Sequence, residues 1–214
     1  MKQPIAVLTG DIIASQRITD TTALYQALET SLERLADHYG GRFERYRGDG
    51  FQLAIPNTSA ALDAAVALRA ELVMHSEEQR WDARIAVAVG YNEWQPDRSL
   101  ASADGPVFVA SGKTLDTMTE EGEHLALSRP DAADDDAITL LVRYVDELID
   151  DWSHHSAEIA YLKFWHPESQ QAMAERLNIR QPSVHKRLRT ARWSMLADTL
   201  DFFRHRLAAE DKAS

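Results

Sequence analysis

The stretch RYRGDGFQLAI, residues 45–55, places Asp49 between two glycines in a segment that otherwise reads as β-strand. Apolar side chains alternate after the glycines, which predicts a strand over 51–55. Glycine tolerates the positive φ of a tight turn, so residues 48–50 predict the turn of a hairpin whose first strand covers 42–47. Asp49 is therefore either a turn residue only, or a carboxylate that the turn holds in place for a ligand.

The segments around this hairpin predict an α+β fold. A continuous apolar run at Ile5–Leu8 is typical of a buried strand, and leucines three or four residues apart predict a helix over 21–39. Strand, helix, hairpin, helix and strand in this order predict a mainly antiparallel sheet with helices on one face. The later expected elements are a helix from Asn57–Ser59 to about Glu78, a strand over 84–90, a helix over 106–118 and a strand near 124–127.

Charge is distributed unevenly along the chain. The net charge of the 214 residues is -11, but residues 151–214 hold 10 Lys and Arg against 8 Asp and Glu. Within 167–193 there are six basic and two acidic residues. The carboxy-terminal part therefore suits a polyanionic partner that the acidic remainder would repel.

The composition also excludes several classes of protein. The chain has no cysteine, which excludes disulfides and thiolate metal sites. No apolar run approaches the roughly 18 residues of a membrane span, and the amino terminus does not read as a signal peptide. We therefore expect a cytoplasmic protein without a membrane partner.

The stretch SRPDAADDD, residues 128–136, predicts a boundary, because Pro130 breaks the chain and the three consecutive aspartates at 134–136 suit a helix start. A helix with a regular apolar stripe follows over 138–152, and this stripe could form a dimer seam. We therefore expect an α+β domain over 1–128, connecting helices over 129–165 and an all-α module over 166–214.

Asp11 stands at the end of the first buried strand, where an unpaired charge is costly. That strand commonly lies beside a hairpin of this kind, so Asp49 could face Asp11 across the edge of the sheet. Two adjacent carboxylates repel each other unless one is protonated or a cation lies between them. Mg²⁺ is the natural candidate, since it takes carboxylate, water and phosphate oxygens.

Three motifs resemble the class III nucleotidyl cyclase domain, whose sheet is ferredoxin-like. They are AVLTGDIIASQRI (6–18), RYRGDGFQLAI (45–55) and RIAVAVG (84–90). The segment DGPVFVASGK (104–113) brings the chain closest to the SatD-like group. The resemblance covers roughly residues 4–118.

This resemblance implies that Asp11, Asp49 and the carbonyl of Ile12 hold Mg²⁺ or Mn²⁺, and that the ligand is a purine nucleotide. The nucleotide-binding residues that it implies are Ile13, Ala14, Ser15, Arg17, Arg45 and Lys113. Phe108 and Gly112 stand where the cyclases use Asn and Arg, so we expect cyclase activity to be weak or absent.

Residues 170–196 read as two helices joined by a short turn, in which Asn178 can take the left-handed conformation. The sequence SVHKRLRTAR (183–192) resembles the recognition helix in the fourth region of sigma factors. A packed helix pair with a solvated basic face is the alternative. The residues expected to contact double-stranded DNA are Arg180, Gln181, Ser183, Lys186, Arg187 and Thr190.

These inferences together predict a homodimeric DNA-binding transcriptional regulator whose cyclase-like domain senses a Mg²⁺-nucleotide. One alternative is a nucleotidyl cyclase or related phosphoryl transferase with a basic docking tail. Another is a vestigial domain that is kept as a dimerisation scaffold.

Overall fold

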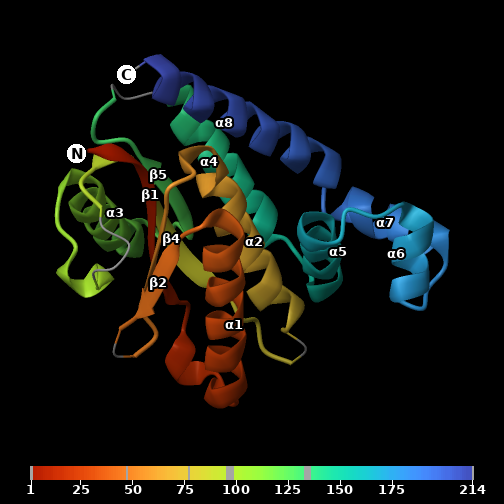
Figure 1. Cartoon of the computed structure of the whole chain (residues 1–214). Coiled ribbons are helices and arrows are strands. Elements are labelled where there is room, and N and C mark those ends of the chain that lie inside the picture. The colour runs from red at the N-terminus through yellow and green to blue at the C-terminus, as the bar shows by residue number, and fades with distance from the viewer. Residues whose placement is uncertain (1, 47, 77, 95–98, 133–135, 214) are drawn as a thin grey trace.

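A computed structural model describes residues 2–46, 48–76, 78–94, 99–132 and 136–213 (Figure 1). Its first part alternates strands and helices, and its second part is helical. The first part contains β1 (Gln3–Ile12), η1 (Ser15–Arg17), α1 (Thr21–Tyr39), β2 (Arg42–Arg45), β3 (Phe51–Ile55), η2 (Thr58–Ala60), α2 (Ala61–Met74), β4 (Ala83–Asn92), η3 (Leu100–Ser102), α3 (Pro106–Glu121) and β5 (Leu125–Ser128). The second contains α4 (Asp136–Asp150), α5 (His154–Trp165), α6 (Gln170–Arg176), α7 (Gln181–Thr190) and α8 (Trp193–Ala213).

The strands form one five-stranded sheet in the order β2-β3-β1-β4-β5. β1 lies at its centre and pairs antiparallel with β3 on one side and β4 on the other. β5 pairs parallel with β4. The mainly antiparallel α+β class predicted from the element order is confirmed, and so is the position of the first strand beside the hairpin.

Helices cover both faces of this sheet. Alternate residues of β1 point to opposite sides, so Leu8 belongs to the core under α1 and α2, while Val7 packs with Val107 and Phe108 of α3. Figure 1 shows α3 on one side of β1, with α1 and α2 on the other. The two helices expected on one face of the sheet, α1 and α2, are there. α3 covers the opposite face, which the prediction had left uncovered.

Local signals set the ends of the first helix. Asp20 caps α1 by accepting a hydrogen bond of 2.9 Å from the amide of Ala23. The helix ends at Gly40, which adopts a left-handed conformation with φ 65°. The predicted helix over 21–39 is confirmed.

The other boundaries shift by a few residues. β2 ends at Arg45, and residue 47, which was expected to belong to this strand, lies outside the described residues. α2 follows the short helix η2 and stops at Met74, which is earlier than expected. β4 extends beyond the predicted 84–90 at both ends. Two of the three aspartates expected at the start of α4 also lie outside the described residues.

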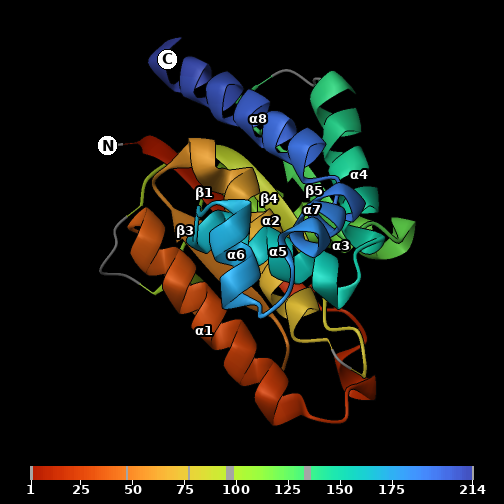
Figure 2. The same cartoon turned by 90° about the vertical axis from the view of Figure 1, so that its right-hand side faces the viewer.

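The helical part packs against the first part of the chain. The apolar stripe expected to form a dimer seam is buried within its own chain through Ile138, Val142, Val145, Ile149 and Trp152. α5 packs on α2, and α8 packs on η2. Figures 1 and 2 show α5, α6 and α7 beyond α2, and α8 running from α7 back towards the end of the sheet where β1 begins.

No helix in the described part of the chain has both the length and the apolar character that crossing a membrane requires.

Candidate functional site

Asp11 lies at the carboxyl end of β1, directly opposite Arg84 of β4. Arg84 donates two hydrogen bonds to its carboxylate, from Nε to Oδ1 and from Nη2 to Oδ2, both 2.9 Å long. Both side chains are about one-quarter exposed. The sequence predicted that a metal ion neutralises the negative charge of Asp11. In the structure, Arg84 compensates this charge. Arg84 is the first residue of the predicted strand 84–90, which lies next to β1. A basic residue at the start of that strand is the sequence signal that could have identified the partner of Asp11.

Asp49 lies in the hairpin between β2 and β3, and its carboxylate accepts a hydrogen bond from the hydroxyl of the buried Ser15. The turn closes through a hydrogen bond of 2.9 Å from the amide of Tyr46 to the carbonyl of Gly50, and Gly48 supplies the positive φ of 92°. The predicted turn is confirmed. The Ser15 contact also brings the hairpin against the loop that follows Asp11.

Gly10 allows β1 to approach its neighbours closely. A Cβ atom at this position would lie 2.5 Å from the ring of Phe51 and 2.4 Å from the carbonyl oxygen of Arg84. Any larger residue would therefore push apart the strands that carry Asp11 and the hairpin.

A row of polar side chains crosses the sheet beside these carboxylates. The Tyr46 hydroxyl donates to Gln52 over 2.9 Å, and Gln52 donates to Thr9 over 3.0 Å. Thr9 in turn lies 2.8 Å from the hydroxyl of Ser111 on α3. This row links the hairpin, β3, β1 and α3. Sequence reasoning missed it, although Thr9 and Asp11 interrupt an apolar strand at alternate positions and so share one face.

The loop after β1 carries several of the predicted ligand residues. Ile12 is buried in the β1–β4 ladder, and the amide of Ile13 donates to the carbonyl of Asp82 over 3.0 Å, so that amide is already engaged. Ala14 is exposed and left-handed, with φ 50°. Arg17 is exposed in η1.

Two predicted nucleotide contacts lie on other parts of the sheet. Arg45 is opposite Phe51 in the β2–β3 ladder, on the face covered by α1, where it pairs with Glu29 and its guanidinium lies 4.7 Å from the ring centre of Tyr25. Asp11 points to the opposite face. Lys113 is exposed on α3. Arg45 is thus not brought together with Asp11.

The two positions where the cyclases use Asn and Arg differ in their surroundings. Phe108 is buried in the core beneath α3, and nothing lies within 4 Å of a Cβ built on Gly112. Neither side chain can orient a ribose or stabilise a phosphate.

A second charged cluster lies between α2, the start of β4 and α4, and its central residue, Arg69, is buried. Arg69 is fully buried and donates to both oxygens of Asp82 over 2.8 and 2.9 Å. It also donates to Asp146 and Asp150 over 2.6 Å each. His124 joins the cluster, with its Nδ1 atom 2.9 Å from Asp150 and its amide donating to Asp146 over 2.8 Å.

His124, Asp146 and Asp150 have the spacing of a metal site, since their ligand atoms all lie within 4.8 Å of one another. Arg69 already bonds to both carboxylates, however, so a cation of the protein stands where a metal charge would be needed. We therefore interpret the cluster as an ion-pair network that attaches α4 to the sheet.

The pKa values in this network follow from burial and ion pairing. Burial alone would raise the pKa of Asp150, but its hydrogen bond to His124 and the charge of Arg69 lower it to about 2. Burial likewise opposes ionisation of Asp82, and Arg69 outweighs it, so that the pKa of Asp82 lies below its usual value. The hydrogen bond to Asp150 raises the pKa of His124.

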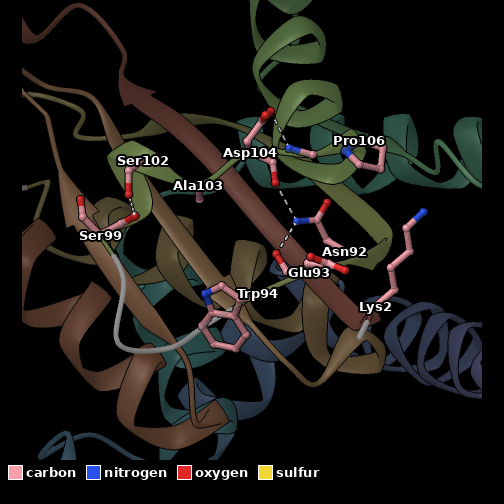
Figure 3. Close-up of a pocket in the computed structure, with 10 residues that line it drawn as sticks. Lys2, Asn92, Glu93, Trp94, Ser99, Ser102, Ala103, Asp104 and Pro106 are labelled. Atoms are coloured by element: carbon pink, nitrogen blue, oxygen red, sulfur yellow. Dashed lines mark hydrogen bonds between the residues drawn. The ribbon is translucent and has the colours of Figure 1, made fainter.

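A pocket of about 380 Å³ lies at the amino terminus of α3 (Figure 3). Asn92 lines the pocket, and its side-chain amide donates hydrogen bonds of 2.9 Å to the carbonyls of Glu93 and Asp104. These bonds link the end of β4 to the loop before α3. Lys2 also lines the pocket. A lining with one cation and two carboxylates favours no single ligand charge. Residues 104–106 of the lining begin the segment DGPVFVASGK that resembles the SatD-like group, but the sequence predicted no pocket there.

Helices α6 and α7 form the pair expected from the sequence. Asn178 in the connecting turn is left-handed, with φ 52°, as predicted. Val184 and Ala191 are buried, and the indole nitrogen of Trp152 donates to the carbonyl of Ala191 over 3.2 Å. This bond ties the end of α7 to the segment that connects α4 and α5.

Most of the residues predicted to contact DNA lie on the exposed side of this pair. Arg187 differs, because it is only 19% exposed and pairs with Glu158 of α5. Arg189 was not among the predicted contacts, yet it is exposed on the same helix. Gln181 donates to Gln170 over 2.9 Å. The exposed predicted contacts are Arg180, Gln181, Ser183, Lys186 and Thr190.

Comparison with protein-family models and with curated proteins gives no match. Several solved structures resemble the chain. A bacterial light-regulated adenylyl cyclase is 16% identical, with a TM-score of 0.47 over 60% of this chain and 77% of its own. The GGEEF domain of a diguanylate cyclase from Vibrio cholerae is 15% identical, with a TM-score of 0.46 over 61% and 85%. The adenylyl cyclase CyaB from P. aeruginosa is 15% identical, with a TM-score of 0.43 over 55% and 73%. These similarities are too low to carry an activity across to this chain.

Proposed function

We propose that the chain is a DNA-binding regulator in which α7 is the recognition helix. The observation that carries this proposal is the charge on the exposed side of α7. Lys186 and Arg189 are exposed there and form no ion pair with any described residue, whereas Arg176 and Arg187 are paired with Glu168 and Glu158. Unpaired cations on an exposed helix are available to phosphates and base edges.

We further propose that the protein binds DNA as a homodimer, because a single module of this size rarely binds tightly. Two recognition helices must then be about 34 Å apart to meet successive major grooves. Analytical ultracentrifugation of the full chain tests the dimer. A monomer at concentrations that saturate DNA would contradict it.

Fluorescence anisotropy with labelled genomic fragments at low salt tests DNA binding. Lys186→Ala and Arg189→Ala should each weaken binding. If the side chain contacts a phosphate, each variant should also reduce the slope of log affinity against log salt concentration by about 1. Arg143→Ala is the matched control, because Arg143 is an exposed arginine on α4. Absence of binding at low salt, or equal affinities for all four proteins, would contradict the proposal.

A second proposal concerns the edge of the sheet that carries Asp11 and Asp49. We infer that these carboxylates bind a Mg²⁺-nucleotide, and the hydrogen bond between Ser15 and Asp49 supports this, because it brings the hairpin to the loop after Asp11. The cation would supply positive charge to bridge these carboxylates and phosphate oxygens. Arg84 engages one lone pair on each oxygen of Asp11, and its positive charge would repel such an ion.

A melting-temperature screen of nucleotides with and without Mg²⁺ tests this second proposal. A ligand at 100 times its dissociation constant stabilises the folded state by about 2.7 kcal/mol, and Asp49→Asn should abolish the shift. A scaffold without a ligand predicts no shift at all. Incubation with ATP or GTP and Mn²⁺, followed by chromatography, should give little or no cyclic product, because Phe108 and Gly112 replace the catalytic side chains of the cyclases.

A further inference from the structure

The outward side of α8 carries two large apolar side chains. Figures 1 and 2 show this helix along the outside of the molecule. Its inward side is buried through Leu196, Leu200, Phe203 and Leu207. On the outward side, Met195 is 51% exposed and Phe202 is 47% exposed. They stand seven residues apart, which is about two helical turns, so they lie on one line along the helix.

The ring of Phe202 is supported by its neighbour in the chain. It packs edge to face against the buried ring of Phe203, with the ring centres 5.8 Å apart. Apolar side chains scattered singly over a surface are normal, whereas those that share one line of a helix form a patch that a partner can cover. Covering Met195 and Phe202 would remove their apolar area from water, which favours association.

The charges on this side of α8 are arranged symmetrically about Phe202. Asp198 precedes Phe202 by four residues and Arg206 follows it by four. Met195 precedes it by seven residues, and the small Ala209 follows it by seven. All five residues are exposed, and we call them the outer stripe of α8. Spacings of four and seven residues keep them on one face of the helix.

Such a stripe is complementary to a second copy of itself. When two identical helices pack antiparallel about a two-fold axis, a residue before the axis meets the equivalent residue after it. With the axis at Phe202, Asp198 of each copy meets Arg206 of the other. Met195 of each copy meets Ala209, whose small side chain leaves room for it. Opposite charges and matching sizes therefore coincide in one register.

We propose that α8 packs antiparallel against α8 of a second copy of this chain, with the two-fold axis at Phe202. The two Phe202 rings would contact each other, and two ion pairs between Asp198 and Arg206 would fix the register. The pairing rests on the homodimer proposed above, for which it supplies the surface. The stripe of α4 that the sequence favoured for this role is buried within its own chain.

This pairing also sets a distance between the two α7 helices. α8 begins at Trp193, nine residues before Phe202. At a rise of about 1.5 Å per residue, the two beginnings of α8 would lie about 27 Å apart along the pair. Figure 1 shows α7 beyond the beginning of α8, so the two α7 helices would lie farther apart than this. The spacing of about 34 Å between successive major grooves is compatible with such an arrangement.

The surface at the beginning of α8 suits the end of a second α8. A groove of about 720 Å³ lies there, and Lys163, Arg192, Trp193 and Met195 are among the residues that line it. None of the described residues in its lining is acidic. Because Met195 would meet Ala209, the carboxyl-terminal end of the other α8 would lie at this groove. That end of a helix carries a partial negative charge, which the two cations complement.

A single cysteine tests the position of the axis, because the chain has no cysteine of its own. Packed helices have axes about 8–10 Å apart and Cα atoms about 2.3 Å from each axis, so facing Cα atoms come within about 4–6 Å. A disulfide spans this distance. Phe202→Cys in the full chain should therefore form a linked dimer under mild oxidation. Met195→Cys is the matched control, since its two copies would lie about 21 Å apart and should stay unlinked.

Exchange of the two charges tests the register without removing Phe202. Asp198→Arg and Arg206→Asp should each raise the dissociation constant of the dimer at least about tenfold, because like charges then face each other. The double variant reverses both ion pairs and should restore the affinity towards that of the wild type. Sedimentation equilibrium measures all four proteins. A double variant that associates no more tightly than the single variants would overturn the proposal.

Phe202→Asp should make the chain monomeric and lower its affinity for DNA at least about tenfold, although α7 is unchanged. Tyr144→Asp is the control, because Tyr144 is an exposed aromatic residue on another helix, α4. A dimer that Phe202→Asp leaves intact, or a Phe202→Cys protein that links no more than Met195→Cys, would overturn this surface and leave the homodimer standing. A wild-type monomer would overturn both, while the α7 variants test DNA binding separately.

Discussion

Arg84 and Asp11 face each other on adjacent strands and form a two-point ion pair, with both hydrogen bonds 2.9 Å long. Ser15, four residues after Asp11, donates a hydrogen bond to Asp49, and the sequence predicts a metal between Asp11 and Asp49. A divalent ion at Asp11 must therefore compete with a guanidinium that is already in place, and this competition can be measured.

Arg84→Met should strengthen divalent-ion binding, because it frees the Asp11 carboxylate and removes a nearby positive charge. We expect Mg²⁺ or Mn²⁺ to bind at least about tenfold more tightly than to the wild-type protein, which corresponds to about 1.4 kcal/mol. Calorimetric titration measures the change. The double variant Arg84→Met with Asp49→Asn serves as the control, and equal affinities in both variants would rule out the predicted metal site.

Arg69→Met should destabilise the fold strongly, because the buried Asp82 and Asp146 and the partly exposed Asp150 would lose their common counter-charge. Removing one partner of a buried ion pair costs about 3–5 kcal/mol. Urea unfolding followed by circular dichroism gives the free energy. Arg143→Met, which breaks an exposed pair with Glu123, should change stability by less than about 1 kcal/mol. Similar losses in both variants would contradict the network interpretation.

His124 should make the protein less stable as the pH rises. Its pKa is higher in the folded state than in the unfolded chain, because protonated His124 bonds to Asp150. This contribution is complete below about pH 6.5, the usual value for histidine, and is lost as the pH rises through the folded-state pKa. Since the side chain is 28% exposed, we expect less than about 1 kcal/mol. The difference in unfolding free energy between wild type and His124→Gln, measured across pH, isolates the effect, and a flat difference would refute it.

Asn178 should tolerate glycine but not alanine, because its φ is 52°. A left-handed conformation costs about 1–2 kcal/mol for a residue with an ordinary Cβ, and glycine avoids this cost. We expect Asn178→Ala to lower the free energy of unfolding by about 1 kcal/mol and Asn178→Gly to leave it nearly unchanged. Equal effects would show that this turn does not impose the conformation.

Local patterns predicted most of the elements correctly. The leucine spacing and the glycine after Tyr39 gave α1 its bounds, and the Gly-Asp-Gly turn gave the hairpin, because helix ends and tight turns depend on a few neighbouring residues. The position of Asn178 was predicted for the same reason. Boundaries such as the start of α2 shifted, since the preceding turn formed a short 3₁₀ helix instead.

Contacts between distant segments decided the rest. The composition and the periodicity of the sequence determined an α+β part followed by helices, with a basic segment near the end. Only the tertiary structure decided that Arg84 neutralises Asp11, that Arg45 faces α1, and that Arg187 is held by Glu158. A buried charge takes whichever partner the packing of the whole chain brings within a few ångströms, and spacing along the sequence does not encode that distance.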